Sequence, residues 1–397
     1  MQEAELHDCT LEGLSMVESL EALVTSKTDA VFFPEGAPSA HPAWPQMPDV
    51  PYVVMLRDAV VYPKPSLDAV SLADPGPVPK TLGRKDLHLV TGQDGKVLPD
   101  GFGKSHFVPM NLSREEAGWR GVLPPVRDRL KGVHLFAEMV YGHFGHALVD
   151  MPTRLWPLAT LGLHADALAG VVALPMLGVT PMGDMPGHTA AMIEAMGVPR
   201  QKLRFPAGPV RIERLIVARR SAPYLGRMDG AFNAVMQTAG RRLAAQSDLG
   251  GDLPERLYLS RSRLTDDPRG GEELSALDDV FRDMGFEVVH PQTLPLPDQA
   301  ALVRAARYVA GPVGSQLHLC AFSEREGLGV FSIGPDYFTL PINGRILAAL
   351  GGRETQFLLP CERPPPPRDR APWRFDPDEV PRLRREVEAW LSPSGGE

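Results

Sequence analysis

The sequence lacks several features that would fix the class of protein at once. Its 397 residues carry a formal net charge of -8, and general binding to nucleic acid, which relies on Lys and Arg neutralising phosphates, is therefore not expected. No apolar run reaches about 18 residues, and the first residues lack a basic start followed by an apolar stretch. The three cysteines (Cys9, Cys320 and Cys361) are far apart and form no CxxC pair, which favours neither a disulfide framework nor a structural zinc site. We therefore expect a soluble cytoplasmic protein.

Three well-known catalytic and nucleotide-binding motifs are also missing. Without GxSxG there is no nucleophile elbow of the hydrolase type. Without GxxxxGK[ST], or GxGxxG after a strand, the chain offers neither a P-loop nor the dinucleotide fingerprint of a NAD-dependent oxidoreductase.

The length and the pattern of apolar residues predict two α/β domains. A single hydrophobic core stops growing at about 250 to 300 residues, and this chain is longer. We predict an N-terminal acceptor-side domain over residues 1–225, with a β-rich extension at its start, and a C-terminal domain over residues 226–397. Strand and helix patterns alternate from Val133 onward, which predicts parallel sheets. Two Rossmann-like domains facing across a cleft are therefore expected, with ligand near the carboxyl ends of the strands.

The individual elements follow from local patterns. A hairpin is predicted over residues 50–62, with its turn at Arg57-Asp58, after an irregular Pro-rich segment (Pro34 to Pro51). A C-terminal helix over 376–391 is expected to dock on a domain face, with the N-terminal domain as a candidate partner, while the chain between Gly334 and this helix is predicted to be irregular. Strands are predicted at 171–175, 213–218, 256–261, 287–289, 308–310 and 329–334, and helices at 143–150, 189–196, 230–246, 272–284, 298–307 and 315–322.

The turn after the strand at 308–310 has the composition of a phosphate-binding turn. Gly311 and Gly314 permit close approach of a ligand to the backbone, and Ser315 can cap the helix that follows. Unpaired N–H groups and the positive end of a helix suit a phosphate-bearing ligand such as a nucleotide-sugar. An ordinary tight strand-to-helix turn uses the same glycines, and this alternative stays open.

Two arginines follow the strand at 256–261. Arg261 and Arg263 offer guanidinium groups that can bind a diphosphate through two parallel hydrogen bonds, which lysine cannot do. The alternative is a surface ion pair with one of the nearby acids, Asp266, Asp267 or Glu272.

The histidines near residue 145 are candidates for acid–base chemistry. His143, His146 and Asp150 have the spacing i, i+3 and i+7, which places them on one face of a helix. One interpretation is a general base for an acceptor hydroxyl. Another is a structural cluster in which Asp150 pairs with Arg154.

A metal site is the weakest interpretation of these residues, since a third strong ligand is lacking. The Asp376-Pro377-Asp378 triplet lies at the predicted start of a helix, where capping is expected instead of metal binding. No metal is therefore expected.

Three blocks together resemble glycosyltransferase family 61, also called DUF563, which includes bacterial capsular-polysaccharide enzymes and eukaryotic xylosyl- and N-acetylglucosaminyltransferases. The blocks are GHALVDMPTRLW (Gly145 to Trp156), YLSRSRL (Tyr258 to Leu264) and the segment from Gly285 to Phe322. In the last block, Val313, Ser315 and Gln316 stand where the family pattern GPHGAGL has histidine, alanine and the next glycine. The resemblance implies a GT-B fold and inverting transfer from a nucleotide-sugar.

The resemblance also implies roles for individual residues. The donor, with UDP-sugar as the first expectation, would be bound by the C-terminal residues Arg261, Arg263, Gly311, Gly314, Ser315, Gln316 and His318. Asp150 or His146 would be the catalytic base, with His143 and Arg154 on the acceptor side. The transferred group would be a hexosyl, pentosyl or N-acetylhexosaminyl unit, and no metal or other cofactor is expected.

The acceptor implied by the resemblance is a glycan or a lipid-linked saccharide in capsular or exopolysaccharide biosynthesis. A cytoplasmic location is expected, with peripheral contact to the inner membrane as an option, and the oligomeric state is open. The alternative function is a non-catalytic carbohydrate- or nucleotide-binding protein on the same fold, within a polysaccharide assembly complex.

Overall fold

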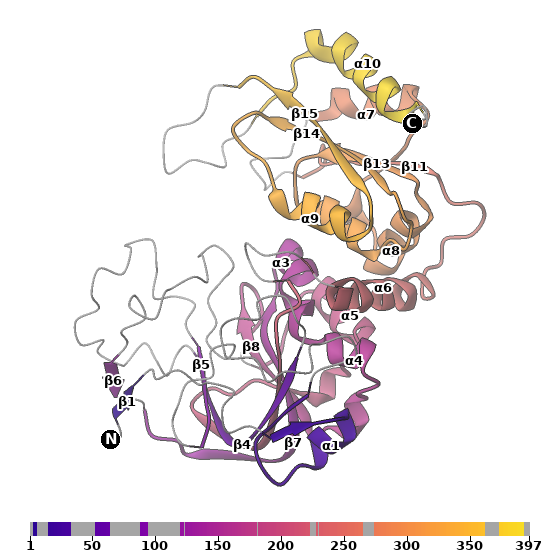
Figure 1. The fold of residues 1–397 in the computed structure, drawn as a ribbon. Coiled ribbons are helices and arrows are strands. Elements are labelled where there is room, and N and C mark those ends of the chain that lie inside the picture. Colours follow the sequence, from indigo (N-terminus) through magenta and orange to yellow (C-terminus); the bar gives the residue numbers. More distant parts are fainter. Residues whose placement is uncertain are drawn as a thin grey trace. The chain divides into compact units, whose positions relative to one another are not determined.

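The computed structural model describes residues 3–5, 15–32, 52–63, 88–93, 120–122, 124–180, 182–222, 228, 230–264, 274–361 and 373–392 (Figure 1). The predictions for Pro34 to Pro51 and for ion pairs with Asp266, Asp267 or Glu272 lie outside these residues. The chain divides into two compact units, Met1–Val235 and Met236–Glu397. The division falls inside helix α6 (Gly230–Ala244), close to the predicted boundary between residues 225 and 226.

The first unit is built on an eight-stranded mixed sheet in the order β2-β3-β4-β10-β7-β8-β9, with β5 paired to β4. The pairs β10–β7, β7–β8 and β8–β9 are parallel, whereas β4 runs antiparallel to β10. The prediction of a parallel sheet is therefore correct for β10, β7, β8 and β9, and wrong for the pairing of β4 with β10. The strands are β2 (Ser15–Val17), β3 (Ala30–Phe32), β4 (Val53–Tyr62), β5 (Leu89–Thr91), β7 (Asp128–Tyr141), β8 (Gly170–Met176), β9 (Leu203–Arg204) and β10 (Val210–Ala218), and β1 (Glu3–Glu5) pairs separately with β6 (Arg120–Val122).

The hairpin predicted over residues 50–62 is wrong, because β4 is one continuous strand. Its pairing with β10 continues on both sides of Arg57 and Asp58. Asp58 has a positive φ of 49°, a conformation that Asp tolerates better than most residues. The polar pair thus kinks the strand locally without reversing the chain.

Short helices cover the first unit's sheet. The predicted helices near 143–150 and 189–196 are confirmed as α3 and α5, although α3 ends at Val149 and is followed by a tighter turn. The core draws apolar side chains from β4, β5, β7, β8 and β10, among them Phe136, Val172 and Leu215. The helices are α1 (Leu20–Thr25), α3 (Phe144–Val149), α4 (Trp156–Thr160) and α5 (Gly187–Ala195), with 3-10 turns η3 (Met151–Arg154), η4 (Ala165–Ala167) and η5 (Arg200–Lys202).

The second unit has the predicted parallel sheet, with five strands in the order β12-β11-β13-β14-β15. Figure 1 shows helices α7 and α10 on one face of this sheet and α8 and α9 on the other. The strands are β11 (Arg256–Leu259), β12 (Glu287–Val289), β13 (Tyr308–Pro312), β14 (Gly329–Pro335) and β15 (Arg353–Leu359), and the helices α7 (Ser275–Asp283), α8 (Leu296–Ala305), α9 (Pro341–Ala349) and α10 (Val380–Leu391), with 3-10 turns η7 (Pro291–Thr293), η8 (Ser315–Phe322) and η9 (Pro377–Glu379).

The prediction of irregular structure after Gly334 is wrong, since α9 and β15 follow there. Along β15 only Phe357 and Leu359 are buried. This strand lies at the edge of the sheet. Its sequence therefore lacks the continuous apolar run by which a central parallel strand is recognised.

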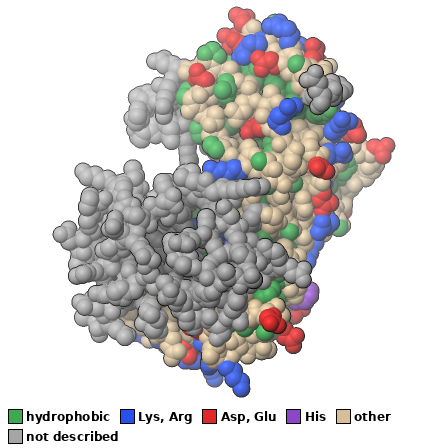
Figure 2. All heavy atoms as spheres, viewed as in Figure 1, with side chains coloured by type: hydrophobic (Ala, Val, Ile, Leu, Met, Phe, Trp, Pro, Cys, Tyr) green, Lys and Arg blue, Asp and Glu red, His purple; other side chains and the backbone are tan. Residues whose placement is uncertain are grey.

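The C-terminal helix packs in the second unit. Leu383 and Val387 of α10 are fully buried in the same core as Phe357 and Phe281. The apolar face of α10 therefore has its partner in the second sheet, and docking on the N-terminal domain is not needed to bury it. Arg382 of α10 pairs with Glu379 and Glu386, and acidic and basic side chains are interspersed on the surface of the second unit (Figure 2).

The strand order of the second unit reverses direction at β11. From β11 the chain passes to β12 on one side and then to β13 on the other side of β11. The loops that follow β11 and β13 consequently separate at the carboxyl edge of the sheet. Ligands of open α/β sheets bind in the crevice at such a switch point, and Arg261 and the Gly311 to Gln316 turn are the residues that the sequence places there.

Candidate functional site

Two glycines shape the turn between β13 and η8, and each makes room for a different neighbour. A Cβ atom on Gly311 would lie 2.8 Å from the carbonyl oxygen of Leu259 in β11. A Cβ atom on Gly314 would overlap the amide oxygen of Gln316 and would lie 2.6 Å from Nη1 of Arg261. Because Gly314 has an extended backbone with φ of 173°, space and not conformation requires a glycine here.

Arg261 reaches across to this turn from the end of β11. Its side chain is buried, with the residue 3% exposed, and Nη1 donates a hydrogen bond of 2.9 Å to Oε1 of Gln316. Nε2 of Gln316 in turn donates to the carbonyl oxygen of Pro312 at 2.5 Å. The structure thus brings together Arg261, Gly314 and Gln316, at the start of η8.

The other predicted donor residues lie around this group. Ser315 is partly buried and is the first residue of η8, whereas Arg263 is exposed. His318 lies further along η8, is buried, and its Nδ1 is 2.8 Å from Oδ1 of Asn343 in α9. His318 thereby ties η8 to α9 within the second unit.

The predicted histidine group forms at the carboxyl end of β7. Nδ1 of His146 lies 2.7 Å from Oδ2 of Asp150, and the ring centroids of His143 and His146 are 4.9 Å apart. The three residues therefore come together as their spacing predicts. Since a carboxylate only accepts hydrogen bonds, this contact with Asp150 places a proton on Nδ1 of His146.

Arg154 belongs to a buried polar network beside this group. It is fully buried, its Nε donates to Oε2 of Glu138, and its Nη1 donates to the carbonyl oxygen of Ala218 at 2.6 Å. Asp150 is bonded to His146, and the pairing of Asp150 with Arg154 that the structural alternative assumes stays a prediction. The acceptor-side role of Arg154 stays a prediction.

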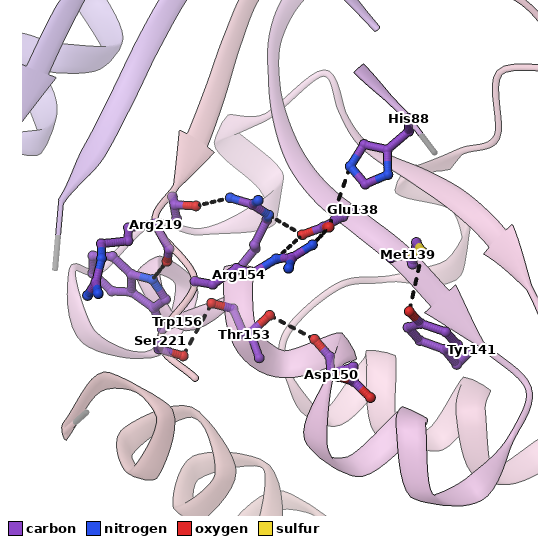
Figure 3. A network of polar contacts seen from close by, with 12 residues as sticks. His88, Glu138, Met139, Tyr141, Asp150, Thr153, Arg154, Trp156, Arg219 and Ser221 are labelled. Atoms are coloured by element: carbon purple, nitrogen blue, oxygen red, sulfur yellow. Dashed lines mark hydrogen bonds and ion pairs between the residues drawn. The ribbon is translucent and has the colours of Figure 1, made fainter. Parts of the chain in front are cut away.

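The same network fixes the segment that carries Asp150 against the end of β10 (Figure 3). Thr153 Oγ1 donates to the carbonyl oxygen of Asp150 at 2.8 Å, and the backbone N–H of Ser221 donates to the carbonyl oxygen of Thr153 at 2.9 Å. Trp156 Nε1 donates to the carbonyl oxygen of Arg219 at 2.8 Å. The backbone around Asp150 is therefore held from several directions.

Glu138 is the centre of this network and was missed by the sequence analysis. It is 4% exposed and binds Arg154 and Arg220, and Nε2 of His88 lies 3.4 Å from its Oε1. Its φ of 65° accompanies a register shift in the pairing of β7 with β8, which is how a β-bulge redirects a side chain. The sequence signal that could have revealed Glu138 is its position as the single acidic residue in the mostly apolar run from Val133 to Tyr141.

His88 is neutral in this network. Burial, followed by the charges of Arg220 and Arg154, holds its pKa well below the ordinary histidine value. The two arginines and Glu138 therefore carry the charges of the cluster.

The residues predicted to cap a helix do so. Oδ1 of Asp376 accepts a hydrogen bond from the backbone N–H of Asp378 at 3.0 Å, at the start of η9. Within the described part of the chain, no group of three or more His, Cys, Asp or Glu side chains is arranged to hold a metal ion. No helix in this part is long and apolar enough to cross a membrane.

Comparison with known sequences finds one similar family. The family model described as Glycosyltransferase 61 matches residues 144–330, and no curated protein matches the chain. The matched range runs from α3 to β14 and contains His146, Asp150, Arg261 and the Gly311 to His318 segment, while His143 lies just before it. This match supports the resemblance of the chain to glycosyltransferase family 61.

Proposed function

We propose that this chain is an inverting, metal-independent glycosyltransferase that transfers a hexosyl, pentosyl or N-acetylhexosaminyl group from a nucleotide-sugar, with UDP-sugar as the first candidate. The observation that carries the proposal is the Arg261 guanidinium held over Gly314, at the switch point of a parallel sheet and at the start of η8. This combination supplies a positive charge beside the first N–H groups of η8, which suits a diphosphate.

On the donor side, the second unit would bind the diphosphate and stabilise it as it leaves. Arg261 and the first N–H groups of η8, from Ser315 onward, would offset the negative charge that develops on the leaving nucleoside diphosphate. Arg263 is exposed two residues further along and is proposed as a second phosphate contact. Gly311, Gly314, Gln316 and His318 would shape this site, His318 by anchoring η8 to α9.

On the acceptor side, the His146–Asp150 pair would remove the proton of the acceptor hydroxyl. The hydroxyl oxygen then attacks the anomeric carbon from the side opposite the diphosphate, and the bond between that carbon and the phosphate oxygen breaks. The proton is left on the base and the electron pair on the nucleoside diphosphate, and the anomeric configuration inverts. His143 would contact the acceptor, and Arg154 would act through the buried network that fixes Asp150.

The proposal includes a GT-B-like arrangement of the two units and a glycan or lipid-linked saccharide acceptor in capsular or exopolysaccharide biosynthesis. The protein would work in the cytoplasm and meet the inner membrane through its acceptor or a partner.

The test is a set of single substitutions examined for both UDP binding and turnover. Arg261→Ala is expected to weaken UDP binding, measured by calorimetry, by about 10- to 100-fold, since a hydrogen bond to a charged group contributes about 1.5–3 kcal/mol. His146→Ala and Asp150→Asn are expected to bind UDP normally but to lose transfer by about 10²- to 10⁴-fold.

Arg256→Ala is the matched control, because Arg256 is exposed at the opposite end of the same strand. Equal UDP affinity in wild type and Arg261→Ala would remove Arg261 from the donor site. Retention of the anomeric configuration in the product, determined by NMR, would overturn the inverting mechanism.

One observation favours the second candidate, a non-catalytic nucleotide- or carbohydrate-binding protein. Gln316 stands where the family pattern has glycine. Its side chain accepts a hydrogen bond from Nη1 of Arg261, an atom that the first proposal uses for the diphosphate. Hydrolysis of a UDP-sugar in the absence of acceptor distinguishes the two candidates, since a binding protein would hold the donor without consuming it.

A further inference from the structure

Two serines on either side of Arg261 are bound by a single buried carboxylate. Oγ of Ser260 donates to Oδ1 of Asp278 at 2.6 Å, and Oγ of Ser262 donates to Oδ2 of the same residue at 2.6 Å. All three residues are buried, and Asp278 is 7% exposed. Each oxygen of the carboxylate therefore receives one short, charge-assisted hydrogen bond.

These bonds hold the backbone on both sides of Arg261. The N–H of Ser260 donates to the carbonyl oxygen of Val289 at 2.8 Å, and the N–H of Ser262 donates to Oγ of Ser260 at 3.1 Å. Both serines bond to Asp278, whereas the Arg261 side chain between them lies beside Gly314 and bonds to Gln316.

Asp278 comes from a separate element, which makes this arrangement more than a local turn. It lies in α7, whose residues Leu277, Val280 and Phe281 are packed in the core of the second unit. The packing of α7 in the core thus fixes the position of the Asp278 carboxylate. Its hydrogen bonds to Ser260 and Ser262 then restrain the loop after β11. A guanidinium held in advance loses less conformational freedom when it binds a ligand.

We propose that Asp278 is a positioning residue for Arg261, acting through Ser260 and Ser262 to set the direction of the guanidinium toward the donor diphosphate. The inference rests on the proposed donor-binding function of Arg261. Asp278 itself is assigned no contact with the substrate. Its effect on binding therefore depends on Arg261 being present.

This dependence separates positioning from a general structural role. Asp278→Asn keeps the size of the side chain but replaces one acceptor oxygen with an NH₂ group, so that one serine loses its acceptor. We expect UDP to bind Asp278→Asn about 5- to 20-fold more weakly than wild type, because a misdirected guanidinium loses part of its charge-assisted bonding. In the double variant Arg261→Ala/Asp278→Asn, UDP affinity should equal that of Arg261→Ala alone, because the two residues act as one unit.

The control is Asp279→Asn, the neighbouring residue of α7. Its side chain is 78% exposed and pairs with Arg282, and UDP affinity should stay at the wild-type value. Circular dichroism and thermal unfolding would establish that each variant is folded at the temperature of the calorimetry. If Asp278→Asn does not fold, Ser262→Ala replaces it, because this variant also removes one of the two hydrogen bonds to Asp278. It is then compared with wild type, Arg261→Ala and the double variant Arg261→Ala/Ser262→Ala.

The outcomes separate this inference from the proposed function. Equal UDP affinity in wild type and Arg261→Ala would overturn the proposed donor site, and the role of Asp278 with it. A loss in Arg261→Ala with wild-type binding in folded Asp278→Asn and Ser262→Ala would overturn the inference alone. A double variant that binds UDP more weakly than Arg261→Ala, by the factor seen for Asp278→Asn alone, would assign Asp278 a general structural role instead.

Discussion

Gly311 and Gly314 are three residues apart, yet their missing side chains make room for different kinds of atoms. The neighbour of Gly311 is the backbone of β11, which cannot move without disturbing the sheet. The neighbours of Gly314 are the ends of two side chains, Arg261 and Gln316, which can rotate away. The same substitution should therefore damage the fold at one position and the proposed site at the other.

Gly311→Ala is expected to destabilise the second unit by about 1–3 kcal/mol, the usual effect of forcing extra atoms into a packed region. Gly314→Ala should change the free energy of unfolding by less than about 1 kcal/mol but weaken UDP binding, because the added methyl group displaces Arg261. Urea unfolding and calorimetry would measure the two effects. Gly250→Ala is the control, since nothing lies within 4 Å of a Cβ atom there; a Gly314→Ala protein with normal UDP affinity would contradict the prediction.

At the scale of elements, the start of η9 and α10 illustrates how a motif acquires its meaning from its place in the fold. An Asp-x-Asp pair can bind a metal ion, but here the first carboxylate accepts the backbone N–H of Asp378 and begins the helical segment. The segment then buries Leu383 and Val387 in the second core. The two acids thus stabilise a helix end.

Asp376→Ala should consequently lower the free energy of unfolding by about 0.5–2 kcal/mol, the usual cost of losing an N-cap. Asp376→Asn, which keeps an acceptor oxygen, should be close to wild type, and Asp378→Ala should have the smaller effect of an exposed first-turn acid. Urea unfolding provides the comparison. Transferase activity that depended on Mn²⁺ and disappeared in Asp376→Ala would show that the capping role is incomplete.

At the scale of the whole molecule, burial of histidines makes the stability of the first unit depend on pH, as shown by three residues in its described part. Burial lowers the pKa of His88, His134 and His188 below the ordinary value, which is about 6.5 in an unfolded chain. Between the lowered folded-state pKa and about pH 6.5, the unfolded chain binds more protons than the folded one. Falling pH therefore favours unfolding in that window, while the contribution is fully present above about pH 6.5.

We expect the first unit to lose stability as the pH falls from about 7.5 to about 5, before most carboxylates titrate. Hydrogen exchange of the amides of β7 and β10, corrected for the intrinsic pH dependence of exchange, reports on this unit. His188→Gln should reduce the slope. Protection that stays constant over this range would contradict the prediction.

Sequence patterns predicted most of the second unit correctly. The strands at β11 to β14, the helices between them and the parallel sheet follow from local periodicity and turn residues, which act over a few positions along the chain. The predictions failed where local signals are weak or ambiguous. Edge strand β15 buries few side chains, and a polar pair in β4 looked like a turn but only kinks the strand.

The amino-acid sequence alone determined the resemblance to glycosyltransferase family 61, the α/β class, the glycine turn at Gly311 to Gly314 and the cap at Asp376, because each depends on neighbouring residues. Tertiary structure alone decided which distant residues meet: Arg261 with Gln316, Asp278 with two serines, and Glu138 with Arg154 and Arg220. The reason is physical. Periodicity states which face of an element is apolar, whereas the partner of a buried charge is chosen by strand order, register and the packing of helices that are far apart in the chain.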